Sequence, residues 1–125
     1  MNGWVGEGTQ SWNGSNYRLY QKTSDIFVPT PANLWVLLDE REDSINDGWF
    51  ASAPTSNPAS YTLVDYPAAR HNRACSFAFA DGRAEIHGWL DARTIPPPGT
   101  ALTLNVPSPN NPDVGWLTQH ATSPP

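Results

Sequence analysis

Carboxylates are concentrated in one short segment of this chain. Five of the twelve acidic residues in the 125-residue sequence fall within nine positions, namely Asp39, Glu40, Glu42, Asp43 and Asp47. Like charges this close repel one another unless a cation, backbone N–H groups or water compensate them. Segment 39–47 connects two apolar runs, and we call it the acidic loop. It is the strongest candidate in the sequence for a binding or catalytic site.

A bound cation is one way to compensate the acidic loop. Ca²⁺ takes several oxygens at once from the carboxylates, carbonyls and hydroxyls of a flexible loop. We therefore expect Asp39, Glu40, Asp43 and Asp47 to be calcium ligands, although their spacing is not that of an EF-hand. The competing interpretation is a solvated loop in which Asp39 or Asp47 caps a turn through backbone N–H groups.

Glycoside hydrolysis is the alternative chemistry for the same residues. It needs two carboxyl groups flanking the sugar, and sugar rings pack on aromatic side chains. The alternative catalytic residues are Glu40, Asp43, Asp47 and Glu85, and the candidate sugar or partner contacts are Trp35, Trp49 and Trp89. A domain this small has little room for a deep cleft, so we commit to no catalytic residue and favour a non-enzymatic role.

The elements that would position these residues are mainly short strands. Thirteen Pro, nine Gly and six Trp indicate a loop-rich β domain, an α+β fold with little helix. The expected strands are 17–22, 34–38, 48–53, 61–65, 74–80 and 83–90. We expect one domain over 1–125, with an irregular segment 1–16, a β core 17–93 and a Pro-rich tail 94–125.

Asp81-Gly82 lies between two alternating runs and predicts a β-hairpin. A two-residue type I′ turn needs φ > 0 at both central residues, for which Asp-Gly is well suited. This turn pairs residues whose numbers sum to 163, so that Phe77 faces Ile86 on the apolar side, while Glu85 and His87 lie on the other side. Near the C-terminus, Asn111-Pro112-Asp113 predicts a helix over 112–119.

The three histidines and the lone cysteine do not form an active site. His71 and Asp81 are separated by ten strand steps, roughly 30 Å in a straight strand. We interpret His71, Asp81 and Gly82 as a structural signature that marks the two ends of a strand. Cys75 is expected to be buried and unreactive. The chain has no P-loop, no G-x-S-x-G and no zinc-ligand spacing.

The segment HNRACSFAFADGRAEIHGW (71–89) combines a His, nine further residues and Asp-Gly, and LDEREDSINDGWF precedes it. Together they resemble the prepilin-type processing-associated domain of pseudopilin-like proteins from planctomycetes and verrucomicrobia, relatives of the major pseudopilin of type II secretion. The segments that carry the resemblance extend from about Met1 to His120. Arg83 stands where many members of that family have a His.

The resemblance implies a role in assembly or binding in the cell envelope, the periplasm or outside the cell, with other pseudopilins as partners. It also implies a calcium-binding loop, since major pseudopilins of type II secretion bind calcium. Members of that family normally begin with an apolar membrane helix, and none is expected in MNGWVGEGTQSWNGSNY. The net charge of −5 argues against nucleic acid as a partner, whereas carbohydrate remains the alternative ligand.

Overall fold

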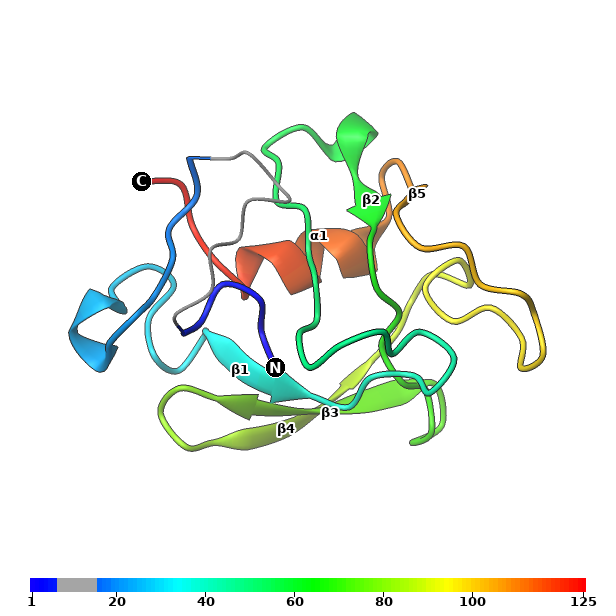
Figure 1. Ribbon diagram of the computed structural model, residues 1–125, viewed down its shortest axis with the longest axis horizontal. Coiled ribbons are helices and arrows are strands. Elements are labelled where there is room, and N and C mark those ends of the chain that lie inside the picture. Colours follow the sequence, from blue (N-terminus) through cyan, green and yellow to red (C-terminus); the bar gives the residue numbers. More distant parts are fainter. Residues whose placement is uncertain (7–15) are drawn as a thin grey trace.

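The computed structural model describes residues 1–6 and 16–125. In this part of the chain, an antiparallel sheet has the strand order β1-β3-β4, where β1 is Trp35–Leu38, β3 is Ala74–Phe79 and β4 is Ala84–Gly88. A second antiparallel pair joins β2 (Thr62–Leu63) to β5 (Val106–Pro107). The helix α1 (Pro112–Gln119) lies across one face of the larger sheet (Figure 1). The predicted small β-rich fold with a short C-terminal helix is thus confirmed.

The core forms between α1 and the sheet because β3 alternates apolar residues toward one face. Cys75, Phe77 and Phe79 are at most 2% exposed. The Phe77 ring makes edge-to-face contacts with three tryptophans, at centroid distances of 6.0 Å from Trp35, 6.0 Å from Trp89 and 5.0 Å from Trp116. Burial raises the pKa of Cys75 to about 11, which keeps the thiol protonated and unreactive, as expected.

The hairpin β3–β4 forms where the sequence predicts it, but its predicted register was wrong by one residue. Phe77 pairs with Glu85, and Ser76 pairs with Ile86. The turn contains three residues, 80–82, closed by the Phe79 N–H, which donates to the Arg83 carbonyl at 2.8 Å. Only Gly82 of these three has a positive φ, +89°. This is a type I turn followed by a left-handed glycine, which adds one residue to the loop.

The shift of register reverses the faces of β4, because side chains alternate along a strand. Ile86, expected on the apolar side, is 62% exposed on the outer face of the sheet. His87, expected on the other side, instead faces the helix and stacks on Trp116 with 3.7 Å between ring centroids. The helix-facing side of β4 therefore carries Glu85 and His87.

The helix α1 begins where the sequence predicts, whereas two of the expected strands are much shorter. Asn111 caps α1, because its Oδ1 accepts hydrogen bonds from the N–H groups of Asp113 (2.9 Å) and Val114 (3.4 Å), as predicted. The expected strands 17–22 and 48–53 are reduced to isolated bridges at Tyr20 and Phe50. In the described loops, residues Thr23–Asp25 (η2) and Pro58–Ser60 (η3) form 3₁₀ turns.

The N-terminal segment is held by a buried side chain. Asn2 is completely buried, and its Nδ2 donates to the carbonyl of Trp35 at 2.8 Å and to that of Ala121 at 3.0 Å. The rest of the segment predicted to be irregular, from residue 7 to 15, lies outside the described residues. No helix in the described part of the chain is long and apolar enough to cross a membrane.

Candidate functional site

A pocket of about 510 Å³ opens between the end of the acidic loop and the segment after β2. Its lining includes the indole of Trp49, the side chains of Asp47 and Asp65, and the apolar side chains of Val64 and Leu104. We call it the indole pocket. Its volume lies within the range of about 300–1,000 Å³ typical of small-molecule sites.

Asp65 is the most buried polar side chain of the indole pocket, with 3% of the residue exposed. Its Oδ2 accepts a hydrogen bond of 2.5 Å from the N–H of Ala51. Within the described residues, its Oδ1 accepts no hydrogen bond. Burial raises the pKa of Asp65, and the charge of Asp47 raises it further.

Asp47 has a structural function in addition to lining the pocket. Its Oδ1 accepts a 2.6 Å hydrogen bond from the N–H of Trp49, two residues later. This is the turn-capping contact that the competing interpretation of the acidic loop proposed for Asp47. The contact fixes the backbone at Trp49, and both residues line the pocket.

Glu40 lies close enough to this pair to interact electrostatically with it, although it does not line the pocket. The pKa of Glu40 is raised to about 7, first by burial, and further by the charges of Asp65 and Asp47. The hydroxyl of Ser44 donates to Glu40 Oε1 at 3.0 Å, which partly offsets this rise. Near pH 7, Glu40 is therefore about half protonated.

The remaining acidic residues of the loop are paired with arginine. Arg41 binds Asp43 through two hydrogen bonds, at 2.6 and 2.9 Å. Arg70 reaches Asp39 at 3.0 Å and Glu42 at 2.5 Å. These arginines hold the pKa values of Asp43 and Glu42 below their usual range. The acidic loop thus divides into an arginine-paired half and a half that faces the indole pocket.

The four predicted calcium ligands do not converge in this arrangement. Asp39 and Asp43 are each bound to a different arginine, while Glu40 and Asp47 lie on the side of the pocket. Among the described residues, no three His, Cys, Asp or Glu side chains are arranged to hold a metal ion. A calcium ion in the loop would have to displace arginines, and calcium binding stays a prediction.

The structural signature residues lie at the two ends of β3. His71 is exposed, and its backbone N–H donates to the carbonyl of Ala74 at 3.3 Å. The residue next to it, Arg70, contacts the acidic loop through its ion pairs to Asp39 and Glu42. At the other end, Asp81 Oδ1 accepts from the N–H of Arg83 at 3.0 Å, which closes the turn with Gly82.

Two of the three tryptophans proposed as sugar or partner contacts are in the core, which corrects that expectation. Trp35 is 0% exposed and Trp89 is 4% exposed, so neither ring is available at the surface. Their indole N–H groups donate to the backbone carbonyls of Leu117 and Ala68, respectively. Only Trp49 is half-buried and lines a pocket.

Glu85, the remaining alternative catalytic residue, is not part of the indole pocket. It forms an ion pair with Arg83 and lies 3.9 Å from Nδ1 of His87. His87 is stacked against Trp116, and His120 stacks on the same indole with a centroid distance of 4.4 Å. Burial lowers the pKa of His87, so the His87 imidazole is neutral near pH 7.

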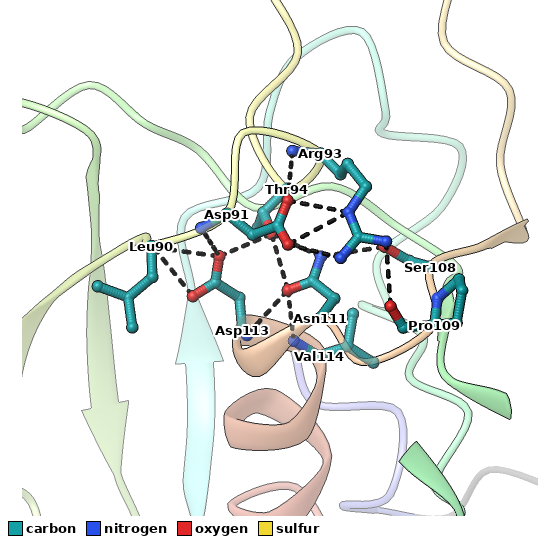
Figure 2. Close-up of polar contacts among 9 residues, drawn as sticks. All are labelled: Leu90, Asp91, Arg93, Thr94, Ser108, Pro109, Asn111, Asp113 and Val114. Atoms are coloured by element: carbon teal, nitrogen blue, oxygen red, sulfur yellow. Dashed lines mark hydrogen bonds and ion pairs between the residues drawn. The ribbon is translucent and has the colours of Figure 1, made fainter. Parts of the chain in front are cut away.

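A second buried polar cluster surrounds the start of α1 (Figure 2). Asp113, 1% exposed, accepts hydrogen bonds from the N–H groups of Leu90 (3.0 Å) and Asp91 (2.9 Å) and from the hydroxyl of Thr94 (2.7 Å). Asn111 Nδ2 donates to the same threonine at 3.1 Å. These contacts tie segment 90–94 to the helix, so the cluster is structural.

Sequence reasoning missed Asp65 as a site residue. It is the last residue of an expected strand, 61–65, which is a common place for a functional side chain, but a single Asp at a strand end is a weak signal. Its significance depends on the approach of the acidic loop, which is 18 residues earlier at Asp47.

No family model, curated protein or solved structure matches the chain.

Proposed function

We propose that this chain is the globular domain of a pseudopilin-like envelope protein, acting in assembly or binding rather than catalysis. One observation carries the proposal. The two halves of the sequence signature, LDEREDSINDG and the His/Asp-Gly strand, lie side by side and stabilise each other. Such a unit is suited to presenting a rigid surface to neighbouring proteins.

The first half contacts both the second half and the residues just before His71, through backbone and side chains. Strand β1, which leads into the acidic loop, pairs with β3 in an antiparallel ladder. The Asp39 N–H donates to the Ser76 carbonyl at 3.3 Å, and the Asp39 carbonyl accepts from Ala68 N–H at 2.8 Å. Arg70 adds its ion pairs to Asp39 and Glu42. A motif whose members hold each other in place is expected of a scaffold.

Calcium is part of the proposal as a stabiliser of the acidic loop. The test is thermal unfolding in EDTA, then in millimolar calcium, with magnesium as the comparison. A ligand that binds only the folded state at 100 times its Kd adds about 2.7 kcal/mol to the free energy of unfolding. We expect a calcium-specific rise in Tm that is absent from Asp43→Ala/Asp47→Ala. Asp25→Asn, which removes a carboxylate outside the loop, is the matched control.

The assembly role is measured separately, by sedimentation of the chain over a range of concentrations and with other pseudopilins. We expect association, unaffected by sugars. A chain that stays monomeric and binds no pseudopilin contradicts the assembly role. Failure of calcium to raise the Tm contradicts only the calcium-stabilised loop.

Glycoside hydrolysis is the second candidate function, favoured by one specific observation. Glu40, with its pKa of about 7, lies near two carboxyl groups that line a pocket together with Trp49. A protonated carboxyl near a carboxylate is the arrangement that glycosidases use for acid–base chemistry. Chromogenic glycosides test it directly. Turnover that Glu40→Gln abolishes and Glu42→Gln retains would replace assembly as the proposed function.

A further inference from the structure

We propose that the indole pocket binds an alkylammonium group, that is, a protonated primary amine on an apolar stem. The lining supplies two carboxylates at one part of the pocket and aromatic and aliphatic surface elsewhere. This inference goes beyond the assembly role and depends on the chemistry of the pocket alone.

The first argument is the unpaired oxygen of Asp65. A buried carboxylate normally has hydrogen bonds to both oxygens, because an unpaired one costs free energy. Asp65 is 3% exposed and lines the pocket, and within the described residues only its Oδ2 has a protein donor, the N–H of Ala51. Its Oδ1 has no donor among the described residues, and a ligand that donates a hydrogen bond would supply one.

The second argument is charge. Asp47 and Asp65 both line the pocket, and no arginine or lysine of the described residues does. Asp47 and Asp65 each raise the pKa of Glu40, which the Met1 ammonium lowers in part, and Asp47 raises the pKa of Asp65, so the two pocket carboxylates repel each other. A positive charge between them relieves this repulsion, whereas a neutral sugar hydroxyl supplies a hydrogen bond but no charge.

The third argument is the apolar part of the lining. Trp49, Val64 and Leu104 form aliphatic and aromatic surface next to the carboxylates. An alkyl stem buries apolar area against these side chains, and an ammonium near the indole gains a cation–π interaction. A bare metal ion uses none of this surface. A lysine-like amine uses both parts of the pocket.

The test is titration of the ¹⁵N-labelled full chain, followed by NMR at the indole N–H signal of Trp49, assigned with Trp49→Phe. The probes are Nα-acetyl-lysine methylamide and its Nε-acetylated form, which differ in the charge of the side chain. We expect saturable shifts with the amine and none with the acetylated form.

Two variants and a control assign the effect to the pocket. Asp65→Asn and Asp47→Asn each keep an oxygen for the backbone N–H that the aspartate caps, and each should weaken binding at least tenfold. Glu42→Gln removes a charge from the arginine-paired half and should bind like the wild type. Should Asp65→Asn fail to fold, Asp47→Asn carries the comparison.

Two further probes separate the source of the amine from other ligands. Tighter binding of 1,4-diaminobutane than of the capped lysine indicates a free diamine, and the reverse indicates a lysine side chain of a partner protein. Equal shifts with the acetylated lysine, or shifts with cellobiose but not with the amines, would overturn the proposal. Wild-type affinity in both aspartate variants would also overturn it.

Discussion

Asp113 and Asp65 are both almost completely buried, with 1% and 3% of their surface exposed, yet their surroundings differ. Asp113 receives hydrogen bonds at both oxygens from two backbone N–H groups and a threonine hydroxyl. Asp65 receives one such bond, at Oδ2, and lines an open pocket beside a second carboxylate.

The difference separates a structural carboxylate from a candidate binding residue. At Asp113, protein donors replace water, so the buried charge stabilises the junction of segment 90–94 with α1. At Asp65, neighbouring carboxyl groups add repulsion, and the pKa is raised. Burial alone does not distinguish the two residues. The two residues differ in the number of hydrogen-bond donors that reach them and in the sign of the nearby charges.

The largest expected effect is at the structural carboxylate. Asp113→Ala leaves the N–H groups of Leu90 and Asp91 and the hydroxyl of Thr94 without their acceptor. Because unsatisfied buried donors cost about 1–3 kcal/mol each and relax in part, we expect a loss of about 3 kcal/mol. Urea unfolding measures it. A loss below 1 kcal/mol would mean that solvent replaces the carboxylate and that the two regions do not differ.

The next effect is the pH dependence that Glu40 confers. Its pKa is about 7 in the folded state and near 4.5 in the unfolded chain, so the folded state binds the proton more tightly. The free energy of unfolding should therefore fall as the pH rises from 4.5 to 7 and be level on either side. After discounting for solvent screening, we expect about 1–2 kcal/mol.

Glu40→Gln tests this directly, because glutamine cannot ionise and keeps an acceptor for Ser44. Urea unfolding should give a smaller difference in the free energy of unfolding between pH 5 and pH 8 for the variant than for the wild type. Glu42→Gln is the control and should retain the wild-type difference. If Glu40→Gln keeps the wild-type difference in the free energy of unfolding between pH 5 and pH 8, the pH dependence belongs to another group.

Asp65→Asn should have a smaller effect of opposite sign to Asp113→Ala. The variant keeps an acceptor for Ala51 N–H and removes a charge that its neighbours disfavour. We expect a gain of up to about 1 kcal/mol at pH 8, and less at pH 5, where Glu40, with its pKa of about 7, is protonated and no longer adds to the repulsion. Thermal unfolding at the two pH values checks this. Destabilisation at pH 8 would show that the carboxylate is structural, like Asp113.

The smallest effect is expected in the arginine-paired half of the acidic loop. Arg70 and Glu42 are exposed, and exposed ion pairs contribute little and are screened by salt. Arg70→Gln should leave the unfolding midpoint unchanged in 0.5 M NaCl. A clear loss at high salt would show that Arg70 holds the acidic loop by packing as well as by charge.

Much of the secondary structure was predictable because it depends on neighbouring residues. Asn111-Pro112 determines the start of α1 through capping and a preset φ, and the bounds of the helix agree with the prediction. The alternation of Cys75, Phe77 and Phe79 predicts β3 and its buried face. The register of the hairpin was wrong because Asp-Gly fits both a two-residue turn and a three-residue turn with glycine at its end.

The candidate site was only partly predictable. The acidic loop identifies Glu40 and Asp47, but its pattern does not show which carboxylates pair with arginine. Trp35 and Trp49 look equivalent in the sequence, and only packing buries one and leaves the other half-buried at a pocket. Burial raises the pKa of Asp65, and a carboxylate from a loop distant in the chain raises it further.

The sequence by itself determined the β-rich class, the hairpin and the helix, since these follow from local backbone preferences and side-chain periodicity. Tertiary structure decided which carboxylates are neutralised and which repel one another. The electrostatic environment of a charge depends on distance through space, and it is the packing of segments far apart in the chain that brings Asp47 and Asp65 into one pocket and gives Asp113 its donors.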